Sequence, residues 1–258
     1  MIKIENLVTM SPAQMDAIIR GMRNPKNSWH LMDSTTEYIR DENTLEAADY
    51  QYHVGEKDMG LMKRLNAGGA VHAKYKRMMV VYMDITAPLY WWKEFDTYKV
   101  GTVANSCSTM HKIHSKEFTM DDFSCEHLSY RSIRMLGDTI DIMNDYRRAY
   151  IEYKDGDLYI ENDGRIMSKK DIWWQMIQLL PSSYNQKRTV MLNYEVLTEM
   201  YKWRKNHKLD EWKTFCEFIE KNMPYAELIV GEEPEEEGIM PANEVRELLG
   251  LSQVKEEK

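Results

Sequence analysis

The stretch YKRMMVVYMDITAPLYWWKEFDTY, Tyr75–Tyr98, decides the fold of this chain. In its first half two apolar sets of residues alternate, which predicts a central β-strand over Tyr75–Thr86 that is covered on both faces. Ala87-Pro88 ends the strand, because proline lacks the amide hydrogen that a strand interior donates. The residues that follow, Leu89–Tyr98, predict a helix.

The residues before this stretch predict three more elements, two before an unassigned region and one after it. Met1–Val8 alternates apolar and polar residues and predicts a short strand. A helix is predicted over Ser11–Met22, because serine caps a helix and the proline after it suits the first helical position. Glu56–Asn66 predicts a second helix, which a pair of glycines ends. The polar stretch Asn24–Gly55 has no clear period and is left unassigned.

The residues after the central stretch predict a mainly helical half. A loop of small polar residues, Gly101–Ser108, comes first, and residues 155–164 predict a short hairpin. Apolar residues at helical spacing predict four helices: Ser129–Tyr153, Lys169–Leu180, Gln186–Arg204 and Leu209–Asn222. We therefore predict an α+β protein with one domain over residues 1–230 and a solvated tail over residues 231–258.

The composition is that of an ordinary globular protein of 258 residues, with 43% hydrophobic and 29% charged residues. Its formal net charge of −8 argues against a broad surface for nucleic acid or anionic membrane, since both require an excess of Lys and Arg. Much of the negative charge lies in the tail, in Glu232, Glu233, Glu235, Glu236 and Glu237. We expect no nucleic-acid partner and no membrane partner.

Other residue types exclude further classes of site. The three cysteines are widely spaced and form no CxxC pair: Cys107, Cys125 and Cys216. Met1–Met10 lacks the apolar core of a signal peptide, and no stretch is long enough to span a bilayer, so we expect a cytoplasmic protein. His111 and His114 have the spacing of a metal pair, but no third ligand is evident, and we predict no metal site.

A family resemblance begins at Ala87 and runs through APLYWWKEFDTYKVGTVANSCS. This segment resembles the flavin-dependent thymidylate synthases, in which a strand ending in AP is followed by RQWxRHR and then SxNExS. Lys93-Glu94-Phe95 falls on RQW, and Thr97-Tyr98-Lys99 falls on RHR. Asn105-Ser106-Cys107-Ser108 falls on NExS. Only one cation of RHR is retained, and Ser106 replaces the glutamate of NExS.

The resemblance extends in the same order on both sides of this segment. His72 lies where the family has a histidine before its central strand, and Leu180-Pro181 matches the LP before its last long helix. Trp212 matches the tryptophan of (L/R)RxxxHAQW, and three basic residues precede it: Arg204, Lys205 and His207.

The resemblance implies a central, mostly antiparallel sheet flanked by long helices. It implies conversion of dUMP to dTMP with FAD as cofactor, methylenetetrahydrofolate and NAD(P)H as co-substrates, and a homotetramer with active sites between subunits. Reduced flavin supplies hydride, so no catalytic residue is assigned to the protein. The implied uracil-nucleotide contacts are Glu94, Lys99, Ser106, Ser108, Arg204 and Lys205. The implied FAD contacts are His72, Thr97, Tyr98, Lys99, Thr102, Asn105, Asn193 and His207.

Simpler interpretations stay open for these residues. The loop of hydroxyl and amide side chains also satisfies ordinary turns, and Arg204 also suits a solvated helix end that carries basic residues. Cys107 is interpreted as a small packing residue, with a nucleophilic thiolate as the alternative. For the whole chain, the alternatives are a nucleotide-binding or scaffold protein that has lost the chemistry, or a flavin enzyme that modifies another pyrimidine nucleotide.

Overall fold

The computed structural model describes residues 2–40, 48–154, 156–161 and 163–231. The predicted tail lies outside the described residues, except for Gly231. None of the helices in these ranges is long and apolar enough to cross a membrane.

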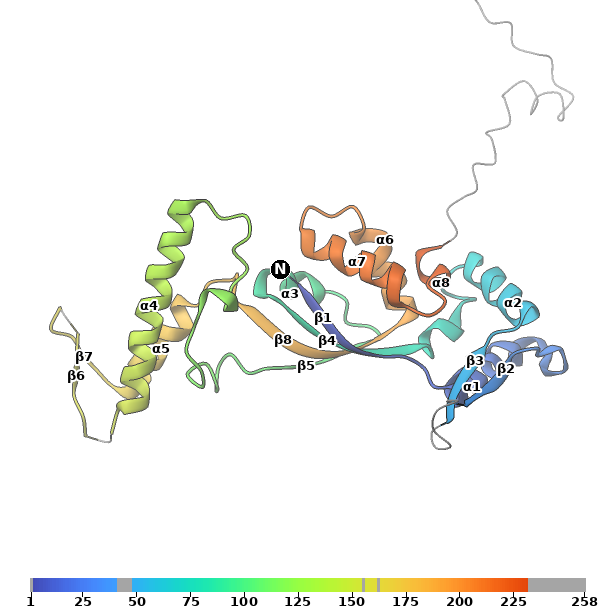
Figure 1. Cartoon of the computed structure of the whole chain (residues 1–258), viewed down its shortest axis with the longest axis horizontal. Helices are drawn as coiled ribbons and strands as arrows, with labels where there is room; N and C mark the ends of the chain where they lie inside the picture. The colour runs from blue at the N-terminus through green and yellow to red at the C-terminus, as the bar shows by residue number, and fades with distance from the viewer. Residues whose placement is uncertain (1, 41–47, 155, 162, 232–258) are drawn as a thin grey trace, which may run out of the picture.

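A four-stranded antiparallel sheet forms the centre of the molecule, in the order β1-β4-β8-β5 (Figure 1). The strands are β1 (Lys3–Val8), β4 (Val80–Pro88), β8 (Asn185–Asn193) and β5 (Thr102–Ser106). The central, mostly antiparallel sheet implied by the resemblance is therefore confirmed. β4 pairs with β1 on one side and with β8 on the other, so it is the central strand that the sequence predicts.

The prediction that β4 is covered on both faces is wrong. Val81, Met83 and Ile85 are at most 1% exposed, whereas Tyr82 on the opposite face is 43% exposed. The element is also shorter than predicted, because Lys74–Arg77 forms a 3-10 helix, η3, before it. The apolar Met78 that suggested a second covered face lies ahead of the strand and is 48% exposed.

Three helices cover one face of the sheet (Figure 1): α3 (Leu89–Phe95), α6 (Tyr194–Arg204) and α7 (Asp210–Asn222). Their contact with the sheet is built from aromatic rings, since Trp91, Trp92 and Trp212 are all 1% exposed or less. The ring centroids of Trp91 and Trp212 lie 4.8 Å apart. In the described ranges, no helix lies beneath the other face of the sheet, which we call the open face (Figure 1).

The prediction of a single helix over Gln186–Arg204 is wrong. Its first half is β8, and only its second half is helical, as α6. Asn193 marks the change, because its side-chain Oδ1 accepts a hydrogen bond from the Val196 amide at 2.9 Å and caps the helix. Similarly, most of the predicted loop after α3 is β5, an edge strand that pairs only with β8.

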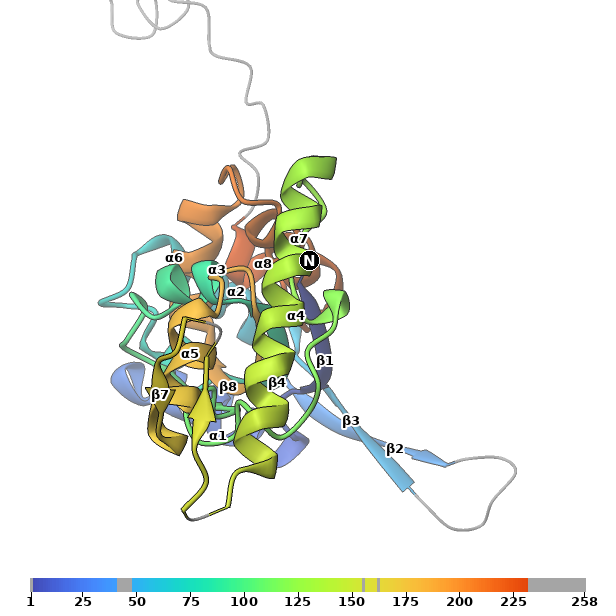
Figure 2. The ribbon, with the colours of Figure 1, turned by 90° about the vertical axis from the view of Figure 1, so that its left-hand side faces the viewer.

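Further elements pack at the two ends of the sheet. At the end near the start of β4 lie α1 (Pro12–Arg23), α2 (Glu56–Ala67), α8 (Glu227–Val230), the short helices η1 (Asn24–Lys26) and η2 (Trp29–Leu31), and a hairpin of β2 (Thr35–Arg40) with β3 (Ala48–His53). Figure 2 shows this hairpin projecting from the body. α1 has the predicted cap, Ser11, and its buried face carries Met15, Ile18, Ile19 and Met22. The hairpin occupies part of the region that the sequence left unassigned.

The opposite end holds α4 (Tyr130–Glu152), α5 (Lys169–Leu179), η4 (Met120–Asp122) and the small pair β6 (Tyr159–Ile160) with β7 (Ile166–Met167). The two helices were predicted within one residue of these bounds, whereas the hairpin was predicted three to four residues too early, over 155–164. They enclose a second hydrophobic cluster that includes Phe118, Ile140 and Met176. The assignment of residues 1–230 to one domain stays a prediction.

Candidate functional site

Glu94, in the last turn of α3, joins three elements on the covered side of the sheet. Its Oε2 accepts hydrogen bonds from Arg204 Nη1 at 2.7 Å and from Trp212 Nε1 at 2.9 Å. Arg204 ends α6 and Trp212 lies in the first turn of α7, so the carboxylate ties the three helices together. Two residues of the resembled motifs, 110 positions apart, are thereby in direct contact.

Tyr98 and His207 complete this cluster. Arg204 Nε donates to the Tyr98 hydroxyl at 3.0 Å, and its guanidinium lies 4.9 Å from the Trp212 ring centroid. His207 Nε2 lies 3.4 Å from the same Glu94 oxygen. Four of the predicted site residues therefore meet, but their polar groups mainly satisfy one another.

A cavity of about 380 Å³ lies beside this cluster, and Thr97, Tyr98 and Lys99 line part of it. Its other wall carries Arg77, which makes a two-point ion pair with Glu195. In the described part of the chain, no carboxylate pairs with Lys99. Glu195 and Glu199 also line this cavity, but neither is within ion-pair distance of Lys99, so the ammonium of this lysine remains available for an anion.

Asn193 and Thr102 lie at the same end of the sheet. Asn193 is 8% exposed, and a Cβ added to Gly101 would lie 2.2 Å from its Nδ2. Gly101 has φ +80°, so glycine is required here both by conformation and by space. The Thr102 hydroxyl is buried without a hydrogen-bond partner among the described residues. Asn193 thus acts in this chain as a helix cap, and its predicted flavin contact stays a prediction.

Ser108 lies in a second cavity, of about 470 Å³, at the opposite end of β5. Three lysines line this cavity: Lys112, Lys116 and Lys187. Hydroxyl groups gather beside them, on Thr86, Ser108, Thr109 and Ser115. Phe118 and Tyr184 supply rings at the wall, with centroids 6.3 Å apart. Such a set of donors and rings suits a phosphate-bearing aromatic ligand.

Two of the three lysines have acidic partners. Lys116 pairs with Asp122, and Lys187 Nζ lies 3.0 Å from Asp84 Oδ2. The hydrogen bond to Asp84 and its charge raise the pKa of Lys187 above its usual value. Within the described ranges Lys112 has no such partner. Asp121 also lines the cavity, so the charges of the three lysines are balanced by the carboxylates of Asp84, Asp121 and Asp122. The cavity therefore offers an anion the ammonium of Lys112 and the remaining N–H donors of the other two lysines, without a net positive charge.

The remaining predicted residues lie outside both cavities. Asn105 and Ser106 are exposed on β5, opposite Thr189 and Arg188 of β8. His72 is exposed and packs near Gly68 after α2. The other outlying residue, Lys205, carries its ammonium 5.6 Å from the Tyr201 ring centroid.

The predicted site is therefore divided between the two ends of β5. The lysines of the 470 Å³ cavity and Arg77 were missed, because lysines 112 and 116 lie in a loop without a recognisable motif. Lys187 was missed because residues 186–193 were interpreted as a helix; in the strand, Lys187 lies opposite Thr86 of β4.

No protein-family model matches this chain. No curated protein sequence matches it either. Among solved structures, it is similar to thymidylate synthase X (ThyX) from Helicobacter pylori with FAD and dUMP. That match has a TM-score of 0.54 and 12% identity, and covers 89% of this chain and 98% of the other.

A second similar structure is the UMP/dUMP methylase PolB from Streptomyces cacaoi, bound with 5-Br dUMP. Its TM-score is 0.51 with 12% identity, over 85% of this chain and 88% of that one. The chain therefore has the fold of the flavin-dependent thymidylate synthases that its motifs resemble.

Proposed function

We propose that this chain is a flavin-dependent enzyme that acts on a uracil nucleotide. The reaction we assign to it is the conversion of dUMP to dTMP with methylenetetrahydrofolate and NAD(P)H. One observation carries the proposal: a lysine-lined cavity adjoins Ser108, in the segment that resembles the family's NExS loop. The shared fold with ThyX, solved with FAD and dUMP, supports it.

The 470 Å³ cavity is the proposed nucleotide site. Its lysines and hydroxyls would hold the phosphate, since ammonium groups and hydroxyls both donate to phosphate oxygens. The rings of Phe118 and Tyr184 would contact the base, and the Nδ2 of Asn185, whose Oδ1 accepts from Ser124, would donate to a polar group on its edge. In this arrangement lysines perform the task that the resembled family gives to arginines.

The 380 Å³ cavity is the proposed contact for part of the flavin cofactor. Lys99 fits a phosphate group, because no described carboxylate lies within ion-pair distance of its ammonium, and Thr97 lines the same cavity. Bound flavin would supply the hydride. The cavity is small for a complete dinucleotide, and the nucleotide cavity is at the other end of β5. Both observations fit a site that a second copy of the chain completes.

The open face of the sheet supports such an assembly. Val8 and Val103 are each 56% exposed there, and Tyr82 is 43% exposed. On the same face the Asp84 carboxylate accepts hydrogen bonds from Thr189 and Asn6 and pairs with Lys187. This face therefore presents apolar groups beside a charge that is already paired. Exposed apolar surface of this kind is typical of a protein–protein contact. We assign it to self-association, in the homotetramer that the resemblance implies.

A second function, nucleotide binding without catalysis, is favoured by the cluster around Glu94. Glu94, Tyr98 and Arg204 bind one another. Two cations of RHR are replaced by Thr97 and Tyr98. A protein that kept the lysine-lined cavity and lost the flavin would have these features.

Absorbance and calorimetry separate these functions. Purified protein that shows flavin absorbance and binds dUMP, with affinity reduced about tenfold in Lys112→Ala, would support the enzyme. Lys26→Ala, an exposed lysine on η1, is the matched control and should bind as the wild type does. Binding of dUMP without any uptake of FAD would favour the non-catalytic protein. Failure to bind either ligand at millimolar concentration would exclude both.

A further inference from the structure

Gln186, near the start of β8, has both ends of its side-chain amide engaged. Its Nε2 donates to the Cys107 carbonyl at 2.8 Å, and its Oε1 accepts from Arg188 Nε at 2.9 Å. A carbonyl only accepts and a guanidinium only donates, so the amide fits between the two groups in a single orientation. Gln186 therefore connects Cys107 to Arg188 in addition to lining the nucleotide cavity.

Arg188 extends this connection to the end of α3. Its Nη1 donates to Asp96 Oδ1 at 2.7 Å, and its guanidinium lies 4.2 Å from the centroid of the Trp92 ring. The buried Trp92 also donates from Nε1 to the backbone carbonyl of Gln186 at 2.9 Å. We call this chain of contacts, from Asp96 through Arg188 and Gln186 to Cys107, the relay.

The strand places the relay on the covered face of the sheet. Gln186 and Arg188 are two positions apart in β8, so their side chains project from the same face. They lie opposite Ala87 and Ile85 of β4, both fully buried. Gln186 is itself only 7% exposed. A polar side chain this deeply buried has few conformations open to it, so it can fix the group that it binds.

The group that the relay binds belongs to the wall of the nucleotide cavity. Cys107 and Ser108 follow β5 directly and both line that cavity. The Cys107 amide donates to the Lys187 carbonyl at 2.9 Å, so Gln186 provides the second bond at this residue. Arg188 and Asp96 line neither this cavity nor the one at Lys99. Any effect of these two residues on a nucleotide must therefore pass through Gln186.

We propose that Gln186 and Arg188 are positioning residues for the nucleotide cavity. Anchored by Asp96, they hold the Cys107 carbonyl and thereby fix the Ser108 hydroxyl in the cavity wall. A hydroxyl donates to a phosphate oxygen only within a narrow range of distance and angle, so a small displacement of the segment lowers affinity. The proposal rests on the proposed function, since it takes the 470 Å³ cavity as the nucleotide site.

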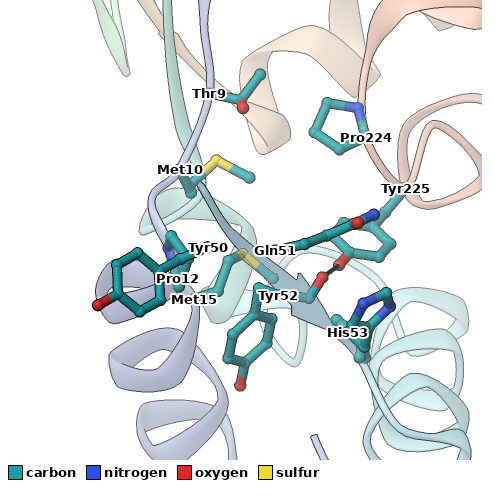
Figure 3. A pocket seen from close by; sticks show the side chains of 11 residues that line it. Thr9, Met10, Pro12, Met15, Tyr50, Gln51, Tyr52, His53, Pro224 and Tyr225 are labelled. Atoms are coloured by element: carbon teal, nitrogen blue, oxygen red, sulfur yellow. Dashed lines mark hydrogen bonds between the residues drawn. The ribbon is translucent and has the colours of Figure 1, made fainter. Parts of the chain in front are cut away.

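The first test needs no ligand and follows amide hydrogen exchange in the full chain. Gln186→Met keeps a long unbranched side chain but removes the donor and the acceptor. Exchange of the Cys107 amide should become at least about tenfold faster, the change expected for one lost hydrogen bond. Gln51→Met is the matched control and should leave that rate unchanged. Gln51 lines a separate cavity of about 490 Å³, which shares no lining residue with the nucleotide cavity (Figure 3).

The second test measures dUMP affinity by calorimetry. Gln186→Met and Arg188→Met should each weaken dUMP binding about tenfold. The double variant should lose about as much as either single variant, because both changes break the same relay, whereas independent effects would multiply to about a hundredfold. Arg148→Met, which removes an exposed ion pair with Asp145 on α4, is the control and should bind dUMP as the wild type does.

Three results would overturn the proposal: unchanged Cys107 exchange in Gln186→Met, wild-type dUMP affinity in Arg188→Met, and multiplied losses in the double variant. Wild-type protein that does not bind dUMP, while Gln186→Met still speeds exchange, would overturn the proposed function and not the relay. If Arg188→Met fails to fold, Asp96→Asn replaces it, since Asp96 is the half-exposed end of the same relay.

Discussion

The Glu94 carboxylate and the Arg204 guanidinium are joined by a 2.7 Å hydrogen bond between the ends of α3 and α6. Trp212 of α7 donates to the same carboxylate oxygen, at 2.9 Å. The three helices that cover the sheet are therefore connected through one acidic side chain. In the resembled motif a glutamine stands at this position, so the charge pair is a feature of this chain.

We expect Glu94→Gln to lower the free energy of unfolding by about 1 kcal/mol. The variant keeps an acceptor for Trp212 but removes the charge that faces Arg204, and the one-third exposure of Glu94 moderates the loss. Urea unfolding measures the change. Glu217→Gln removes one partner of an exposed ion pair with Lys221 and should change stability by less than about 0.5 kcal/mol. Equal effects of the two variants would contradict the structural role of Glu94.

Asp58→Asn should be much more damaging, with a loss of about 3–5 kcal/mol. Asp58 is fully buried, pairs with the buried Arg23, and accepts hydrogen bonds from the Asp33 and Ser34 amides at 3.0 Å each. Removal of its charge leaves the guanidinium of Arg23 buried without a counter-ion. Asp16→Asn, at an exposed pair with Arg20, is the control. A loss below about 1 kcal/mol for Asp58→Asn would mean that the buried pair is dispensable.

Sequence patterns predicted the helices and strands whose signals lie within a few neighbouring residues. Ser11 and Ser129 cap the helices that they were expected to begin, and the alternation around Met83 located the central strand. Residues 24–55 could not be assigned, because Asp58 organises part of that region through bonds across about 25 positions. A period in the sequence contains no information about such contacts.

The boundary between β8 and α6 was not predicted, for a different reason. Val190 and Leu197 are seven residues apart, which satisfies a helical period as well as a strand followed by a helix. Asn193 was interpreted as a ligand contact, although asparagine is also a preferred cap. The preference of asparagine for the cap position would have indicated that the helix begins after Asn193. Because residues 186–193 were interpreted as helical, Lys187 was not predicted to line the proposed nucleotide cavity.

Val103→Glu should disrupt the proposed tetramer. Val103 is 56% exposed on β5 and faces the open side of the sheet, opposite Met191. A buried carboxylate without a partner is costly, so the assembled form should lose stability relative to its parts. Light scattering should give about four times 30.6 kDa for the wild type and a smaller mass for the variant. Val71→Glu, at a 72% exposed valine, should retain the wild-type mass. A wild-type monomer would overturn the assembly.

Asp84 should make the sheet acid-sensitive within a defined window. Hydrogen bonds from Thr189, Asn6 and Lys187 lower the pKa of its carboxyl to about 2. Because the pKa in the folded state is depressed, the stabilisation is complete above the ordinary value of about 3.9 and is lost as the pH falls through about 2. In urea unfolding at a series of pH values, the stability difference between wild type and Asp84→Asn should be constant above about pH 5 and shrink towards pH 2. A difference that does not change with pH would exclude this linkage.

Lys99→Ala tests the proposed flavin contact. Lys99 occupies the last position of the segment that resembles RHR, lines the 380 Å³ cavity with Thr97, and has no acidic partner among the described residues. A charge-assisted hydrogen bond of about 1.5–3 kcal/mol corresponds to roughly ten- to a hundredfold in affinity, so FAD binding should weaken by at least about tenfold. Folding should be unaffected, because the lysine is exposed. Lys202→Ala is the matched control, since that ammonium lies over the Trp203 ring on the surface of α6. Calorimetry with FAD measures both variants. Thr97→Arg should act in the opposite direction, because it restores a second cation beside Lys99, and the proposed contact fails if neither change alters FAD affinity.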